Sequence, residues 1–190
     1  RVGAGAVVID NSRAYGMDDA ARLVVPEVTE AGLEGHAGVV ANPSCVAAPL
    51  VVALKPLADA VGLERVIVSS YQSVSGTGQA AVRELREQTA GLLAGDEPEP
   101  EVYPHPIAFN VLPHIDEFDE SGYTGEERKV AAEARKMLGL PHLAVSATCV
   151  PLSMREKLSR PSWSVPRIWV RLGEVSRSRM LRAIGSCGAI

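Results

Sequence analysis

Short apolar runs separated by polar turns make up most of the first 150 residues. The runs are rich in valine and isoleucine and end at Asn, Ser or Pro, which is typical of buried strands entering loops. We expect strands at 2–10, 23–25, 38–41, 64–71 and 143–150, and an extended segment at 107–115. The acidic, proline-rich stretch at 94–106 predicts a loop.

The sequence pattern predicts helices in three further segments. One begins after Ser44 and Cys45, with Pro49 tolerated in its first turn. Another spans 79–93 and follows the Ser/Gly-rich turn at 73–78. The third, at 125–138, is amphipathic, and its apolar side is formed by Val130, Ala134, Met137 and Leu138. Strands that alternate with helices indicate an α/β fold with a mixed sheet.

The composition narrows the class of protein. The chain has 190 residues, of which 46% are hydrophobic and 22% charged, as expected of a folded globular chain. Its longest apolar stretch, 46–63, contains Pro49, Lys55, Pro56 and Asp59, and a membrane span needs about 18 clean apolar residues. We therefore expect no membrane association. Three cysteines make no even disulfide framework, which favours a reducing, cytoplasmic setting.

The charge is distributed unevenly. The net charge is −4, but residues 1–150 carry 11 Lys and Arg against 21 Asp and Glu, whereas residues 151–190 carry 8 against 2. The last forty residues also contain both tryptophans and show no helical or alternating period. They lack the compact basic block or the aromatic interleaving of a nucleic-acid arm, so we expect no nucleic-acid partner.

The cysteines and histidines are the first candidates for chemistry. Cys45 lies at a predicted strand-to-helix junction, where the helix N-terminus favours the reactive thiolate. The alternative interpretation is a small buried packing residue. Cys149 ends an apolar strand and is expected in the core, and Cys187 receives no assignment. The four histidines, His36, His105, His114 and His142, stand apart from one another, so we expect no metal site.

Several motifs occur together in one order along the chain. They read NPSC at 42–45, YQSVSGTG at 71–78, PIAFNVLPHID at 106–116 and VSATCV at 145–150, preceded by VVIDNS at 7–12 and LVVPEV at 23–28. Together they closely resemble the aspartate-β-semialdehyde dehydrogenase family over almost all of residues 3–150. The resemblance implies the catalytic and dimerisation domain of such an enzyme, with the dinucleotide-binding Rossmann domain largely missing.

The resemblance also implies a reaction. In that family a thiolate attacks the aldehyde of L-aspartate 4-semialdehyde, a hydride passes to NADP, and phosphate cleaves the thioester to give L-aspartyl 4-phosphate. Biosynthetic flux towards lysine, threonine and methionine runs in the opposite direction. Matched residue by residue, Cys45 is the nucleophile and Gln72 orients the substrate. Ser75 and Gly76 match the turn that approaches the nicotinamide cofactor, and sulfur suits a thioester step because it attacks and leaves well.

The predicted helix at 125–138 supplies two more candidates. It resembles the family helix that carries a substrate-binding carboxylate and a phosphate-binding lysine. Glu126 is then the partner of the substrate ammonium and Lys129 that of phosphate, and their spacing of three places them on one helix face. Without the resemblance, such a Glu/Lys pair is ordinary solvated surface.

Four departures separate the sequence from the family pattern. No Gly-rich pyrophosphate-binding turn precedes Val7. Gly16 stands where the family has a phosphate-binding arginine, with Arg13 nearby but out of register. Ser44 replaces the asparagine before the cysteine. After Val150 the sequence matches neither the family's substrate-carboxylate arginine nor its acid/base histidine, which suggests a reading-frame change near residue 150.

These observations predict a division of the chain and its partners. We expect a remnant of the dinucleotide-binding domain at 1–40, a catalytic and dimerisation domain at 41–150 and a divergent basic tail at 151–190. The expected partners are a small-molecule substrate, phosphate and a second copy in a homodimer, and the chain is expected to be a fragment with impaired activity. Two alternatives stay open: an N-acetyl-γ-glutamyl-phosphate reductase, and an inactive remnant that survives by dimerising.

Overall fold

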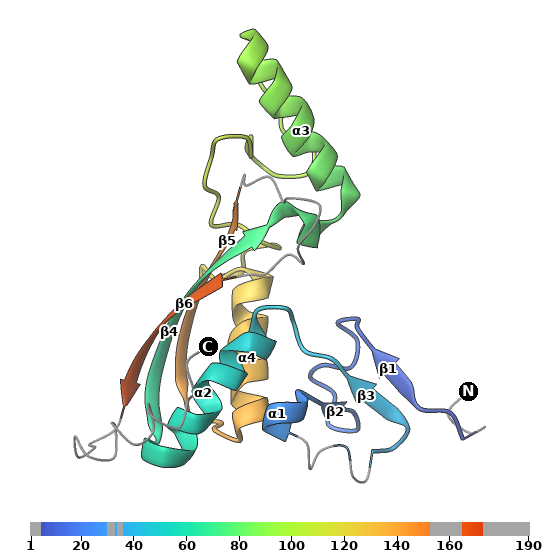
Figure 1. The fold of residues 1–190 in the computed structure, drawn as a ribbon, viewed down its shortest axis with the longest axis vertical. Helices are drawn as coiled ribbons and strands as arrows, with labels where there is room; N and C mark the ends of the chain where they lie inside the picture. Colours follow the sequence, from blue (N-terminus) through green and yellow to red (C-terminus); the bar gives the residue numbers. More distant parts are fainter. Residues whose placement is uncertain (1–4, 30–32, 34–35, 153–164, 173–190) are drawn as a thin grey trace. The chain divides into compact units, whose positions relative to one another are not determined.

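The computed structural model describes residues 5–29, 33, 36–152 and 165–172 (Figure 1). The chain forms two compact units, each built from separate stretches of sequence. Unit 1 comprises Arg1–Val68, Arg128–Ala147 and Ile168–Ile190, and unit 2 comprises Ser69–Glu127 and Thr148–Arg167. The mixture of helices with a parallel sheet confirms the α/β class predicted from the alternating pattern.

Unit 1 begins with a small parallel sheet. Its strands are β1 (Val8–Asp10), β2 (Arg22–Leu23) and β3 (Val39–Ala41), in the order β1-β3-β2. Val8 lies opposite Val39, and Arg22 lies opposite Val40. The strands predicted at 2–10 and 38–41 are present but shorter, and β2 overlaps the predicted run at 23–25 only at Leu23. The prediction that the first strand is buried is wrong, because Ile9 is 74% exposed. The short helix α1 (Pro26–Thr29) follows β2 and was not predicted.

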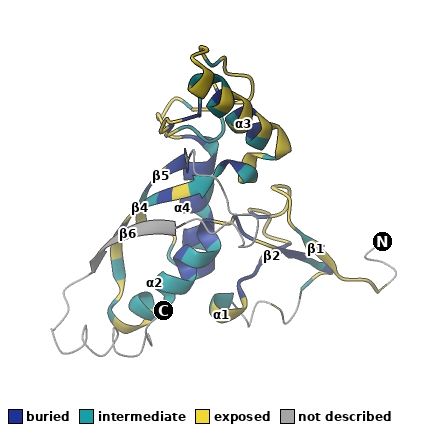
Figure 2. Cartoon of the chain, turned by 45° about the horizontal axis from the view of Figure 1, so that its top comes forward, coloured by how far each residue is buried: buried dark blue, intermediate teal, exposed yellow. Residues whose placement is uncertain are grey.

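Helix α2 (Ala47–Val61) follows β3, as the sequence predicts. Leu50, Val51 and Leu54 on one of its faces are almost completely buried (Figure 2). Pro49 lies in the first turn, where no helical hydrogen bond is lost, whereas Pro56 lies inside the helix and cannot donate to a preceding carbonyl. Gly62 ends the helix with a positive φ of 72°, a conformation that glycine adopts without strain.

A second sheet has the strand order β5-β4-β6. Its members are β4 (Leu63–Ser73), β5 (Ala144–Leu152) and β6 (Val165–Leu172). Strands β4 and β5 were predicted, but β6 was missed because Pro and Arg interrupt its apolar pattern. Residues 153–164 and 173–190 of the predicted tail, with Cys187 and the suggested frame change, lie outside the described residues.

Helix α4 (Gly125–Leu138) has the bounds predicted from its amphipathic pattern. Thr124 and Glu127 form a capping box at its start: Thr124 Oγ1 accepts from Glu127 N at 3.4 Å, and Glu127 Oε2 accepts from Thr124 N at 2.8 Å. The second oxygen of Glu127 accepts from Cys149 N at 3.1 Å. One buried carboxylate therefore fixes both the start of α4 and the backbone of β5.

Unit 2 contains the 3-10 helix η3 (Val74–Thr77) and helix α3 (Gln79–Ala94). Helix α3 is polar over most of its surface, and its buried positions are Ala81, Glu84 and Gln88. A small apolar cluster packs beside it, formed by Val74, Ala81, Tyr103, Ile107 and Leu112. The predicted acidic loop after the helix is confirmed.

Glu84 and Gln88 hold this loop by its backbone. The Glu84 carboxylate accepts from Glu101 N at 3.1 Å and from Val102 N at 2.6 Å. Gln88 Nε2 donates to Glu99 O at 2.9 Å, and Gln88 Oε1 accepts from the amides of Ile107 and Ala108. Both side chains are buried, at 3% and 5% exposure, so these bonds are shielded from water.

The prediction of an extended segment at 107–115 is wrong for its first part, 107–110. The backbone turns at Ala108 and Phe109, and Phe109 has a φ of 56°, which reverses the direction of the chain. Asn110 stabilises this irregular path, because its Nδ2 donates to Pro106 O and its Oδ1 accepts from Val111 N. The apolar residues had suggested a strand, but local amide hydrogen bonds favour a turn.

Candidate functional site

Cys45 lies in the turn that leads into α2, two residues before the first helical residue, Ala47. Ser44 Oγ accepts from Ala47 N at 3.2 Å, and Ser44 O accepts from Ala48 N at 3.1 Å. Ser44 therefore holds two amides at the start of α2, whose N-cap is Val46, and Cys45 is the next residue. The Cys45 side chain is exposed, so the alternative of a buried packing residue is wrong. The predicted position at a helix start is confirmed.

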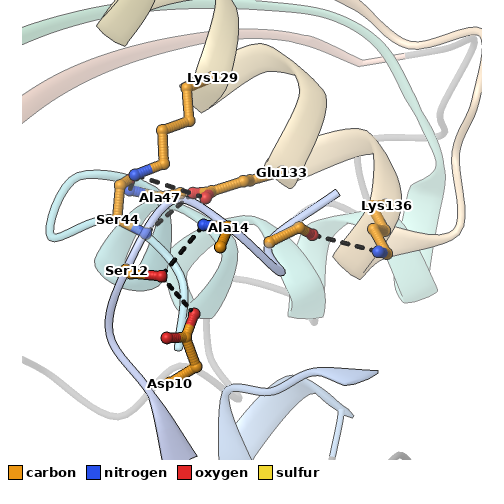
Figure 3. Close-up of polar contacts among 9 residues, drawn as sticks. Asp10, Ser12, Ala14, Ser44, Ala47, Lys129, Glu133 and Lys136 are labelled. Carbon is orange, nitrogen blue, oxygen red and sulfur yellow. Dashed lines mark hydrogen bonds and ion pairs between the residues drawn. The ribbon is translucent and has the colours of Figure 1, made fainter. Parts of the chain in front are cut away.

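The turn that carries Cys45 is held by a buried carboxylate on α4. Ser44 N donates to Glu133 Oε2 at 2.9 Å (Figure 3). Glu133 is only 1% exposed. Sequence reasoning did not single out Glu133, although a signal was present: it lies on the same helix face as Val130, Ala134 and Met137. A charged residue on an apolar face requires a polar partner.

Lys129 lies one helical turn before Glu133. Its Nζ is 3.9 Å from Glu133 Oε1, and its side chain is 25% exposed. The ammonium group is thus close to the carboxylate and still reached by solvent. Glu126, on the same helix, is 7% exposed, so the alternative of a wholly solvated surface pair is wrong for this residue.

The loop after β1 is also attached to α4. Lys136 Nζ donates to the carbonyl oxygens of Gly16 at 3.1 Å and Asp18 at 2.8 Å. A Cβ placed on Gly16 would lie 3.4 Å from Glu133 Oε1. The position at which the sequence departs from the family arginine is therefore beside Glu133. Lys136 was not predicted from the sequence.

The other candidate residues belong to unit 2. Gln72, near the end of β4, is partly buried, and its Nε2 donates to Ser70 Oγ at 3.2 Å. Ser75 and Gly76 lie in η3. Ser75 donates to Ser73 Oγ from both its backbone N and its Oγ, at 3.3 and 3.0 Å. A Cβ on Gly76 would meet nothing within 4 Å, so this side of the turn is open.

Cys149 and Tyr103 have structural surroundings. Cys149 is buried at 1% exposure, which confirms its predicted core position. Burial raises the pKa of Tyr103, and the negative charge of Glu84 raises it further against the opposing hydrogen bond from Thr77. Within the described ranges, no group of three or more His, Cys, Asp or Glu side chains could hold a metal ion. No helix among the described residues is long and apolar enough to span a membrane.

The sequence is similar to one family model and to several curated proteins. Residues 54–154 match the model described as "Semialdehyde dehydrogenase, dimerisation domain". The chain is 49% identical over 158 residues to the aspartate-semialdehyde dehydrogenase of Bacillus subtilis, covering 80% of this chain and 46% of that protein. It is 50% identical over 149 residues to that of Aquifex aeolicus, covering 77% and 44%. The chain thus spans less than half the length of these relatives.

Solved structures show the same similarity. Aspartate semialdehyde dehydrogenase II from Vibrio cholerae matches with a TM-score of 0.84 and 37% identity over 97% of this chain and 54% of its own. The same enzyme complexed with ASA matches with a TM-score of 0.82 and 36% identity, over 96% and 54% of the two chains. The Candida albicans enzyme with NADP is 22% identical, with a TM-score of 0.58 over 92% and 46%, and shares the fold.

Proposed function

The chain belongs to the aspartate-semialdehyde dehydrogenase family, and from this premise we propose that Cys45 is the nucleophile of a phosphorylating semialdehyde dehydrogenase. The observation that carries the proposal is the exposed thiol in the turn that leads directly into α2. At this position the dipole of α2 favours the thiolate. Among the three cysteines of the sequence, Cys45 is the one within the NPSC motif.

The proposed chemistry follows from a thiolate and an aldehyde. Cys45 Sγ forms a bond to the carbonyl carbon of L-aspartate 4-semialdehyde, giving a tetrahedral thiohemiacetal. Loss of hydride from that carbon gives a thioester on Cys45. A phosphate oxygen then attacks the thioester carbonyl, the C–S bond breaks, and L-aspartyl 4-phosphate leaves while the thiolate is regenerated. Flux in biosynthesis runs in reverse, towards lysine, threonine and methionine.

We assign the substrate contacts to three side chains. Gln72 orients the bound substrate, Glu126 attracts its ammonium group, and Lys129 binds phosphate. Two observations support the assignment: the burial of Glu126 with the partial burial of Gln72, and the partly exposed ammonium of Lys129. Partial desolvation strengthens charge-assisted hydrogen bonds to a substrate.

Ser75 and Gly76 fit a nicotinamide cofactor. The open space beside Gly76 allows a planar ring to approach the backbone of η3. NADP, when bound, supplies the acceptor for the hydride. Ser75 and Gly76 would hold its nicotinamide end in this proposal.

The acyl-transfer half of the reaction is the half that the residues of this chain match most fully. Cys45, Gln72 and Lys129 match the residues of that half, whereas no residue of this sequence matches the family's acid/base histidine. We propose a homodimer for the chain, supported by the match to a dimerisation domain, and retain the predicted segments 1–40, 41–150 and 151–190. The aspartate-specific relatives favour this substrate over N-acetyl-γ-glutamyl phosphate.

The acyl-transfer step can be tested without a cofactor. The purified chain is mixed with L-aspartyl 4-phosphate, quenched in acid and digested, and the cysteine peptides are weighed by mass spectrometry. We expect an aspartyl thioester on Cys45, release of phosphate, and no adduct in Cys45→Ser. An adduct on Cys149 or Cys187, or none on a folded chain, would refute the proposal. A chain that stays unacylated and forms stable dimers would favour the inactive remnant, and preferential acylation by N-acetyl-γ-glutamyl phosphate would favour the reductase.

A further inference from the structure

We propose that Glu133 is a positioning residue that ties the turn carrying Cys45 to the ammonium group of Lys129. This inference rests on the proposed function, because it gives Glu133 a role in relation to the nucleophile and the phosphate-binding lysine. Glu133 itself is not assigned to substrate, phosphate or cofactor.

The two carboxylate oxygens of Glu133 have different partners. Oε2 accepts the hydrogen bond from Ser44 N at 2.9 Å, immediately before Cys45. Oε1 faces Lys129 Nζ at 3.9 Å. One planar group thereby fixes a backbone amide and attracts a side-chain cation (Figure 3).

The burial of Glu133 makes this arrangement costly unless both oxygens are used. A carboxylate at 1% exposure has lost nearly all of its hydration, and this desolvation opposes folding unless partners in the protein replace the lost water. A leucine would pack on the same apolar face of α4 without that penalty. The structure therefore assigns the carboxylate a role beyond packing, namely the placement of two groups that the reaction needs at fixed separation.

The placement also limits what can lie beside Oε1. Gly16 approaches this oxygen closely enough that an added Cβ would be in ordinary contact at 3.4 Å. Lys136 holds the carbonyl oxygens of Gly16 and Asp18 from the same helix. Helix α4 thus fixes two loops, the turn before α2 and the loop after β1, through Glu133 and Lys136 respectively.

Two substitutions separate the two roles of Glu133. In Glu133→Gln the amide keeps one oxygen for Ser44 N, but an NH2 donor replaces the oxygen that faces Lys129. In Glu133→Leu both interactions are lost. Glu84→Gln is the matched control, because Glu84 is also a buried carboxylate that accepts backbone amides, at 3% exposure, in unit 2.

Two readouts report on positioning independently of catalysis. Hydrogen exchange of the Ser44 amide measures the Oε2 bond, and competitive acetylation of lysines, read by mass spectrometry, measures the reactivity of Lys129. We expect the Ser44 amide to exchange about tenfold faster in Glu133→Leu, the effect of one lost hydrogen bond. In Glu133→Gln we expect the Ser44 amide to exchange at the wild-type rate but the acetylation of Lys129 to change. We also expect inorganic phosphate to protect Cys45 less well against alkylation.

Each outcome decides the inference. The inference is overturned if the Ser44 amide exchanges at the wild-type rate in Glu133→Leu. It is also overturned if, in Glu133→Gln, both the acetylation of Lys129 and the protection of Cys45 by phosphate are the same as in the wild type. The same changes in Glu84→Gln would also overturn it, because they would reflect a general loss of stability. Failure of wild-type Cys45 to form a thioester refutes the proposed function alone, since the exchange and acetylation results do not depend on it.

Discussion

Replacing Glu127 tests whether one carboxylate fixes the start of α4. In Glu127→Ala, the amides of Thr124 and Cys149 lose acceptors that now lie at 2.8 and 3.1 Å. Glu127 is 6% exposed, so water does not readily replace the lost oxygens. A buried donor without an acceptor costs about 1–3 kcal/mol. Two such donors predict a loss of about 2–6 kcal/mol in the free energy of unfolding.

The conservative variant gives an intermediate prediction. Glu127→Gln keeps one acceptor oxygen and places an NH2 group opposite the other amide, so we expect a loss of about 1–3 kcal/mol. Asp59→Ala is the control, because it removes an exposed carboxylate that pairs with Lys55 at 2.6 Å within α2. An exposed pair of this spacing contributes about 0.3–0.5 kcal/mol.

The assay is equilibrium unfolding in urea of the full chain. Far-UV and near-UV circular dichroism must give coincident transitions before a free energy is extracted. The expected order of destabilisation is Glu127→Ala, then Glu127→Gln, then Asp59→Ala. Equal stability of Glu127→Ala and Asp59→Ala would show that the two amides find other acceptors, and the reasoning from the capping box would be refuted.

Three further substitutions test separate contacts. Tyr103→Phe removes the hydrogen bond with Thr77 and should lower the free energy of unfolding by about 0.5–1.5 kcal/mol at neutral pH. Because burial raises the pKa of Tyr103, the stability that its neutral form contributes is present below about pH 10 and is lost as the pH rises through the raised pKa. In urea titrations, the variant should therefore lose less stability at alkaline pH than the wild type. Gly16→Arg should tighten phosphate binding about tenfold, measured as phosphate protection of Cys45 from alkylation, and unchanged protection would contradict it. Ser44→Ala removes the cap on Ala47 N and should destabilise by about 1 kcal/mol, with Ser44→Asn restoring stability in the same urea titration.

The periodic parts of the fold were predictable from the sequence. The bounds of α4 follow from its apolar positions, and α2 follows from the polar-to-apolar change after Ser44. Segments whose shape depends on side-chain-to-backbone bonds were not predictable in this way. Asn110 fixes the turn at 107–111 through such bonds, and β6 is stabilised by pairing with β4, a contact between residues distant in sequence.

In the candidate site, too, local features were predictable from the sequence and contacts between distant residues were not. The position of Cys45 at a helix start could be inferred from local sequence alone. The T-x-x-E spacing of Thr124 and Glu127 would have indicated a capping box. The bond from Ser44 to Glu133 joins residues 89 positions apart, and helical periodicity can mark Glu133 as buried without naming its partner.

Helix α3 holds the loop that follows it by hydrogen bonds that do not involve the side chains of the loop. Glu84 and Gln88 bind amides and a carbonyl of the main chain, which every residue except proline presents alike. Mutations in the loop side chains can therefore accumulate over evolution while the anchoring is kept. The same property makes residues 96–98, which precede the anchored amides, a natural place to graft a peptide epitope or lengthen the loop.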